Sequence, residues 1–201
     1  GFAIGESSRR LYQQQDGKWV FEGKTLTTGV LALFRDDNIE ERSIFTLDQG
    51  KIRPFEYIYN HAGSKKQKQV HLTFDWQNHI VKSVRGKTWE LPMQNGTLDD
   101  QLYQVVLMQD LQQGKRQLSY MVADDDKKIK TYAPTYVGKE RVKTGIGELE
   151  TLKYERLSAD KKRRTTLWCA PALYYLPVQV EHLEKGDVVT MILQTVTGLP
   201  K

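Results

Sequence analysis

The stretch from residue 42 to residue 84 constrains the fold of this chain more than any other part of the sequence. It contains four short runs that are rich in β-branched and aromatic residues and are separated by turn residues, at 42–47, 52–59, 69–76 and 79–84. Such runs are typical of successive antiparallel strands. The third run alternates most clearly, because its large apolar side chains share one face: Val70, Leu72, Phe74 and Trp76. The stretch therefore predicts a β-meander.

Further strands are predicted on both sides of this meander. Asp16-Gly17 lies between two extended runs and predicts an N-terminal hairpin over 2–13 and 18–28. Later extended runs occupy residues 117–122, 129–142 with a break at Pro134, 148–157, 163–169, 176–183 and 187–196. The last run is apolar on both faces from Val188 to Leu193, which predicts a strand that is central, covered by a helix or lining an apolar interior.

The run 52–59 carries two predictions of its own. Pro54 has no backbone N–H to donate, so it favours a sheet edge or a bulge at that point. The alternation of the run places Phe55, Tyr57 and Tyr59 together on one face.

One helix is predicted at about 97–113. Asn95-Gly96 breaks the chain, Thr97 is the expected N-cap with Asp100 three residues later, and Gly114 is the expected stop. The apolar residues of this segment cover more than a single stripe, so we expect the helix to be buried on two sides.

Roughly a dozen strands and one buried helix predict a mainly β fold, an antiparallel meander curled into a barrel or half-barrel. A chain of 201 residues is long enough for one sizeable core, so we expect a single β-rich domain over 1–201. Because residues 2–5 read like the middle of a strand, we also expect that a segment upstream of Gly1 has been removed.

Composition argues against two classes of partner. No run approaches the roughly 20 apolar residues that a membrane-spanning helix requires. The net charge of +5 is modest, and its basic runs, at 65–68, 127–130 and 161–164, coincide with predicted hairpin tips, where lysines keep sheet edges soluble. We therefore expect no nucleic-acid partner, whereas contact with anionic lipid head groups or an acidic polymer stays open.

No catalytic or cofactor motif stands out, so we expect neither enzymatic activity nor a cofactor. The four histidines lack the spacing of metal ligands, although His71 and His79 could meet across a hairpin. The run 124–126 lacks the further oxygen ligands of a calcium site and is better explained as a turn. Cys169 is the single cysteine, which excludes an internal disulfide and favours a small buried hydrophobe.

Aromatic residues are the candidates for binding. Strand alternation places many of them on one side of the predicted sheet, where they either fill the core or line an apolar cavity of the kind that curled sheets offer to greasy ligands. Arg42 is the charged residue that we expect at the entrance of such a cavity, because it lies next to the apolar pair Ile44-Phe45. The candidate ligand-binding residues are Arg42, Phe55, Tyr57, Phe74, Trp76 and Trp168.

Several short motifs, in this order and spacing, resemble the DUF3108 family. They are Gly5-Glu6, Ser43-Ile44-Phe45, Gly50-Lys51-Ile52-Arg53-Pro54 with Tyr57, Phe74-Asp75-Trp76, Trp168-Cys169-Ala170 and Leu176-Pro177-Val178. That family comprises Gram-negative bacterial proteins of unknown function that are usually made with a signal peptide. The resemblance implies that a first strand and a signal peptide precede Gly1 and that the protein is exported to the periplasm. It also implies a curved antiparallel sheet or barrel similar to the lipoprotein-carrier folds of the cell envelope. It supplies no catalytic residues.

Two functions are therefore expected. The first is a periplasmic, non-enzymatic binding or carrier module for a hydrophobic or amphipathic cell-envelope molecule. The alternative is a scaffold of envelope assembly that binds a protein partner through a sheet edge. Transfer from fold to function is analogy in both cases.

Overall fold

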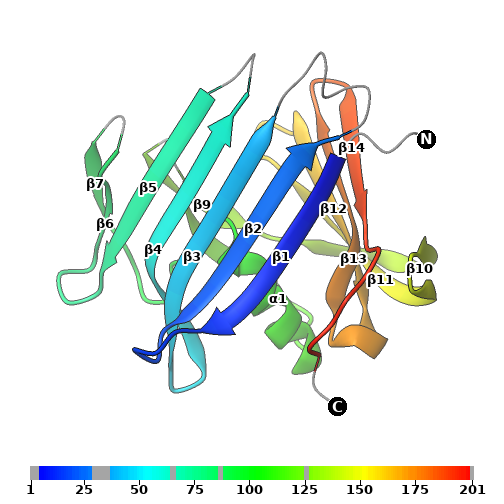
Figure 1. The fold of residues 1–201 in the computed structure, drawn as a ribbon. Coiled ribbons are helices and arrows are strands. Elements are labelled where there is room, and N and C mark those ends of the chain that lie inside the picture. The colour runs from blue at the N-terminus through cyan, green and yellow to red at the C-terminus, as the bar shows by residue number, and fades with distance from the viewer. Residues whose placement is uncertain (1–4, 29–36, 64–66, 86–87, 125–126, 200–201) are drawn as a thin grey trace. The chain divides into compact units, whose positions relative to one another are not determined.

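The computed structural model describes residues 5–28, 37–63, 67–85, 88–124 and 127–199. Within these residues the chain forms fourteen strands, one α-helix and one short 3₁₀ helix (Figure 1). It divides into two compact units. The first unit contains residues 1–104 and 120–131, and the second contains 105–119 and 132–201, so the division falls inside the helix.

The first unit contains a seven-stranded antiparallel sheet whose strands lie side by side in chain order (Figure 1). Its strands are β1 (Gly5–Gln13), β2 (Trp19–Thr27), β3 (Asn38–Asp48), β4 (Lys51–Ala62), β5 (Gln67–Asp75), β6 (Ile80–Ser83) and β7 (Trp89–Pro92). A separate hairpin of β8 (Tyr120–Asp124) and β9 (Lys128–Tyr132) follows the helix. The predicted meander is confirmed, and so is the N-terminal hairpin over its described residues; residues 2–4 of its predicted first strand lie outside the described part.

One row of cross-strand partners runs through all seven strands and defines the face that we call the core face. The row consists of Leu11, Phe21, Ser43, Tyr57, Leu72, Ser83 and Trp89. Because cross-strand partners project to the same side, these side chains share one face. The predicted alternation of β5 is confirmed, since Val70, Leu72 and Phe74 are buried there together with Ala123 of β8.

A bulge in β4 changes which residues reach the core face. The pairing with β3 shifts where Phe45 opposes Pro54 and Ile44 opposes Glu56, which leaves Phe55 unpaired. The prediction of a bulge at Pro54 is confirmed. The prediction that Phe55 shares a face with Tyr57 is wrong, because the extra residue breaks the alternation; Phe55 is 37% exposed whereas Tyr57 is buried.

The helix α1 (Leu102–Gln112) is shorter than predicted and its cap differs from the expected one. The Thr97 hydroxyl donates to the carbonyl of Gln94, while Asp99 Oδ1 accepts from the backbone N–H groups of Gln101 and Leu102. Asp99 is therefore the cap. The helix begins later because Leu98 is still extended and pairs in a parallel bridge with Val122. Four residues of α1 are buried: Leu102, Tyr103, Leu107 and Leu111.

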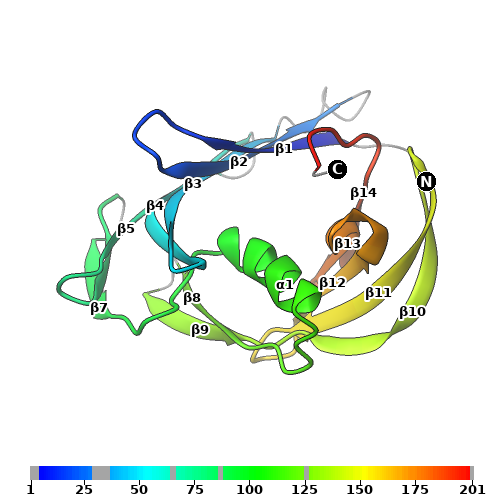
Figure 2. The ribbon, with the colours of Figure 1, turned by 90° about the horizontal axis from the view of Figure 1, so that it is seen from below.

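The second unit contains a five-stranded antiparallel sheet, also in chain order. Its strands are β10 (Thr135–Thr144), β11 (Gly147–Leu157), β12 (Arg163–Ala170), β13 (Leu176–Glu184) and β14 (Asp187–Ile192), with the 3₁₀ helix η2 (Pro171–Leu173) between β12 and β13. Figure 2 shows the bend of β10 and β11, and the register of this pair shifts between Tyr136 and Gly138. Bulges bend strands in this way.

The last strand is an edge strand of the described sheet, so of its three predicted places the central one is wrong. β14 pairs only with β13 within the described sheet, and Val188, Val189 and Ile192 are 54%, 45% and 43% exposed. The apolar composition of β14 does not reveal how many neighbours it has, because an edge strand and a central strand can share the same sequence pattern.

The chain beyond β14 packs on the second unit through backbone contacts. Leu193 donates its N–H to the carbonyl of Val178, and Gly145 donates to the carbonyl of Leu193, both at 2.8 Å. A Cβ atom at Gly145 would collide with the Gln194 carbonyl and lie 2.7 Å from Gln194 Cα. Because Gly145 has no side chain, the backbone of residue 194 can pack directly against it.

We expect Gly145→Ala to lower the free energy of unfolding by about 1–3 kcal/mol, because the added methyl must push the backbone of residue 194 away. Urea unfolding followed by circular dichroism measures the change. Gln194→Ala is the matched control, since it keeps the contacted backbone and removes an exposed side chain with its hydrogen bond to the Ile192 carbonyl. Equal stability of Gly145→Ala and the unmodified protein would contradict the packing described here.

The predicted fold class is confirmed, since the chain is mainly β, its sheets are antiparallel, and α1 is the one α-helix among the described residues. Neither of the two larger sheets closes on itself. No helix in the described part of the chain has the length and apolar composition needed to cross a membrane.

Candidate functional site

A group of polar side chains lies buried on the core face of the first unit. We call it the Asp99 cluster; its members are Glu41, Ser43, Tyr57, Asp99 and Gln101. Ser43 and Asp99 are fully buried, and Gln101 is 2% exposed. Burying so many polar groups is costly unless each finds a partner, so their pairing decides what the cluster can do.

Asp99 is held by one of its two carboxylate oxygens. Oδ1 accepts from the Ser43 hydroxyl at 3.0 Å and from the N–H groups of Gln101 and Leu102 at 3.0 and 2.8 Å. Oδ2 is buried and has no hydrogen-bond partner among the residues that the structure describes. Burial raises the pKa of Asp99 to about 7, and the three hydrogen bonds to Oδ1 oppose that rise.

The second carboxylate of the cluster is paired with a phenol. Tyr57 donates its hydroxyl proton to Glu41 Oε1 at 2.9 Å. Burial raises the pKa of Glu41, with a further contribution from Asp100, while the Tyr57 hydrogen bond and Arg9 lower it. Burial also raises the pKa of Tyr57 well above its usual value, and the nearby carboxylates add to this effect. Burial therefore favours the neutral form of both carboxyl groups of the cluster.

Gln101 faces a place on the sheet where a side chain is missing. Its Nε2 is buried without a partner and lies 3.3 Å from where a Cβ of Gly23 would be. Gly23 stands between Arg9 and Glu41 in a second cross-strand row of the core face. The glycine thus lets the Gln101 amide pack closely against β2, since even a Cβ atom at this position would be in tight contact with Nε2.

Three of the predicted binding residues lie on this face. Tyr57 belongs to the Asp99 cluster, and Phe74 and Trp76 belong to the adjoining apolar core. The Phe74 and Trp76 rings stack with centroids 6.4 Å apart, and the Trp76 indole donates to the Pro54 carbonyl at 2.6 Å.

The other three predicted residues lie elsewhere. Arg42 is adjacent to Ser43 in β3 and therefore projects to the opposite face, where its Nε is buried without a hydrogen bond. Phe55 is exposed at the bulge, 5.9 Å from Lys18 Nζ. Trp168 belongs to the second unit, and its indole donates to Glu140 Oε2 at 3.0 Å. The hydrogen bond from the Trp168 indole lowers the pKa of Glu140, and the hydrogen bond from Lys153 lowers it further.

Sequence reasoning missed four members of the cluster, Glu41, Ser43, Asp99 and Gln101. One signal was present, because alternation in β3 places Ser43 on the same face as Phe45, and a serine on an apolar face needs a buried partner. That partner is 56 residues away in the chain and could not be identified from the sequence.

The histidines and the acidic run do not form a second site. His71 lies opposite Ile58 and its Nε2 is 2.7 Å from Glu56 Oε1, while His79 is in the turn before β6, so the two do not pair. Residues 125–126 lie outside the described part. Among the described residues, no group of three or more His, Cys, Asp or Glu side chains could hold a metal ion.

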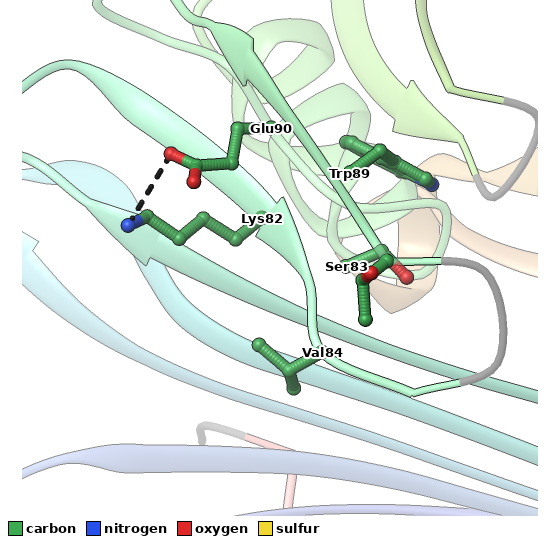
Figure 3. Close-up of a pocket in the computed structure, with 6 residues that line it drawn as sticks. Lys82, Ser83, Val84, Trp89 and Glu90 are labelled. Carbon is green, nitrogen blue, oxygen red and sulfur yellow. Dashed lines mark ion pairs between the residues drawn. The ribbon is translucent and has the colours of Figure 1, made fainter.

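An open pocket of about 390 Å³ lies at the β6–β7 end of the first unit (Figure 3). Its lining residues are Lys82, Ser83, Val84, Thr88, Trp89 and Glu90. Lys82 and Glu90 form an ion pair at 3.3 Å, drawn as a dashed line. This ion pair is solvent-exposed, so it gives the pocket little power to select a ligand. The Asp99 cluster is the stronger candidate.

Comparison with known proteins agrees with this architecture. A crystal structure of a beta-barrel-like protein of the domain of unknown function DUF1849 from Brucella abortus is similar to this chain, with a TM-score of 0.63 and 9% sequence identity over 94% of this chain and 87% of that one. At this identity the likeness concerns the fold alone. No curated protein matches the chain. The family model described as a protein of unknown function (DUF3108) matches residues 1–194, so the chain belongs to the DUF3108 family.

Proposed function

We propose that this protein is a non-enzymatic binding or carrier module of the periplasm, and that it binds a hydrophobic or amphipathic cell-envelope molecule on the core face of its first unit. The observation that supports the proposal most is that two buried polar atoms of the Asp99 cluster are unpaired. Asp99 Oδ2 and Gln101 Nε2 are buried and have no hydrogen-bond partner within the described residues.

Unpaired buried polar atoms are rare because each costs about 1–3 kcal/mol. A ligand that pairs with these atoms would recover that cost, which is the physical basis of a specific polar contact. The aromatic residues next to the cluster, among them Phe74 and Trp89, suit the apolar part of such a ligand. Polar recognition beside an apolar surface is what an amphipathic molecule requires.

Periplasmic location is part of the same proposal and derives from the resemblance to exported Gram-negative proteins. Expression of the natural precursor followed by cell fractionation tests it. Recovery in the periplasmic fraction with a shortened N-terminus supports the location, and recovery of the full precursor in the cytoplasm contradicts it.

The binding function is tested by native mass spectrometry of the protein purified, without detergent, from the periplasm of a Gram-negative host. We expect a stoichiometric adduct, which lipid extraction then assigns to a chemical class. A mass equal to that of the protein alone, across several lipid backgrounds, would contradict the proposal.

A scaffold function is a second candidate because of the edge strand β14. Five of its six residues are exposed, and two of these are the adjacent valines Val188 and Val189. Exposed edges of this kind can accept a strand from another protein. Affinity purification from the native host would favour this function if it yields one stoichiometric protein partner and no bound lipid.

A further inference from the structure

We propose that this protein forms a homodimer through β14, in which the edge strands of two copies pair antiparallel about a two-fold axis. The proposal goes beyond ligand binding and does not depend on it. Three observations lead to it: the lack of protection on this edge, the register that its outward backbone groups allow, and the charges and side chains that meet in that register.

β14 lacks the features that keep exposed sheet edges from pairing. The other edge of the same sheet, β10, has a bulge at 136–138 and the charged run 139–141. In the first unit, β1 carries adjacent arginines at 9–10, and β7 is four residues long and ends at Pro92. Charges, bulges, short length and proline all discourage the addition of a strand. The one charged residue of β14 is Asp187 at its start, and its pairing with β13 has no register shift. We therefore expect another strand to cover this edge.

The β13–β14 hairpin determines which backbone groups of β14 point outward. Its two-residue turn, Lys185-Gly186, has positive φ at both positions, so the flanking pair of Glu184 and Asp187 is hydrogen-bonded. The N–H of Leu193 donates to the carbonyl of Val178, which gives odd-numbered residues the same inward direction at the other end. The residues whose N–H and C=O groups point away from the sheet are therefore Val188, Thr190 and Ile192.

Two copies of β14 can pair all of these outward groups in a single register. Thr190 then lies opposite Thr190 of the second copy on the two-fold axis, and Val188 lies opposite Ile192 of the second copy at both ends. Opposed residues of this kind exchange both of their backbone hydrogen bonds. A register shifted by two residues leaves an outward residue of each strand without a strand residue opposite it. The backbone therefore specifies one self-complementary pairing.

Side chains and charges also match in this register. Val188, Thr190 and Ile192 share one face, so a valine meets an isoleucine at each end and the two threonines meet at the axis. Pairs of β-branched residues favour strand pairing. The Asp187 carboxylates of the two copies lie at opposite ends of the shared ribbon, about 20 Å apart, so like charges do not meet. A second copy of this chain thus fits the edge in backbone, side chains and charge.

Sedimentation equilibrium of the purified protein, from low to high micromolar concentration, tests the dimer. We expect a monomer–dimer equilibrium. Thr190→Lys places two ammonium groups opposite each other at the axis and should raise the dissociation constant of the dimer at least about tenfold. Val137→Lys adds the same charge at a residue of β10 that is 51% exposed and should leave the equilibrium unchanged. A monomer at every concentration would overturn the proposal, and so would a dimer that Thr190→Lys does not weaken.

Cysteine cross-linking tests the register. Cys169 is fully buried, so a cysteine introduced on β14 provides the accessible thiol. Thr190→Cys places two thiols opposite each other at the axis, within the range of a disulfide, whereas Val188→Cys places them about 14 Å apart. With copper phenanthroline as the oxidant, a non-reducing gel should show a covalent dimer for Thr190→Cys and at least about tenfold less for Val188→Cys. Equal cross-linking of the two variants, or none for Thr190→Cys, would overturn the proposed pairing.

Discussion

Replacing Asp99 with asparagine is expected to stabilise the protein at about pH 8 by up to about 4 kcal/mol and to reduce the dependence of its stability on pH. The folded-state pKa of Asp99 is about 7, against an ordinary value of 3.8. The difference, about 3, corresponds to about 4 kcal/mol between the two protonation states. Asparagine keeps the oxygen that caps α1 and accepts from Ser43, but it carries no charge.

The direction of the pH effect follows from proton uptake. Between about pH 4 and pH 7, Asp99 retains its proton in the folded state and has lost it in the unfolded state. The unfolded state therefore binds fewer protons, so stability is highest below this window, falls as the pH rises through it, and levels off above about pH 7. Glu41, whose pKa burial also raises, acts in the same direction and leaves Asp99→Asn with a residual slope.

Urea unfolding at a series of pH values measures this effect. The curves of the unmodified protein and of Asp99→Asn should converge at low pH and separate towards about pH 8. Parallel curves over the whole pH range would contradict the raised pKa of Asp99 in the folded state.

Leu72→Ala is expected to lower the free energy of unfolding by about 2–5 kcal/mol, because it leaves a cavity in the core of the first unit. Leu72 is fully buried and occupies the middle of the row that crosses all seven strands, between Tyr57 and Ser83. Its neighbours on both sides are strand residues that cannot easily move into the space.

Leu47→Ala is the matched control for this change. It removes the same atoms from the same sheet, but Leu47 is 48% exposed near the end of β3. We expect a loss below about 1 kcal/mol there. Similar losses for the two leucines, measured by urea unfolding, would contradict the assignment of the core face.

The sequence predicts those parts of the fold that depend on local pattern. Alternation in β5 identifies its buried face, and the missing N–H of Pro54 identifies the bulge. The predictions from sequence fail where a contact with a distant part of the chain determines the local structure. Phe55 leaves the core face because the bulge shifts its register, and α1 begins after Asp99 because Leu98 pairs with Val122. The edge position of β14 depends on which strands lie beside it, which its own composition does not encode.

The candidate site is predictable from sequence only in part. Tyr57 is identified by its place in an alternating aromatic run, and Ser43 stands out as a polar residue on an apolar face. Asp99 and Gln101 lie in a loop that precedes the helix, and nothing nearby in the sequence connects them to β3. Their role becomes visible only when the sheet and the start of α1 come together in the first unit.

The central claim is that the core face beside Gly23 receives a ligand, and Gly23→Leu tests it most directly. The added side chain would have to displace the Gln101 amide, because even a Cβ at Gly23 would lie 3.3 Å from Gln101 Nε2. Lys24→Leu adds leucine at the next residue of β2, which projects to the opposite face. Each protein is stripped of bound lipid, incubated with a lipid extract of a Gram-negative envelope, and weighed by native mass spectrometry after circular dichroism has verified its fold. We predict a stoichiometric adduct on the unmodified protein and on Lys24→Leu, and none on Gly23→Leu; an undiminished adduct on Gly23→Leu would contradict the claim.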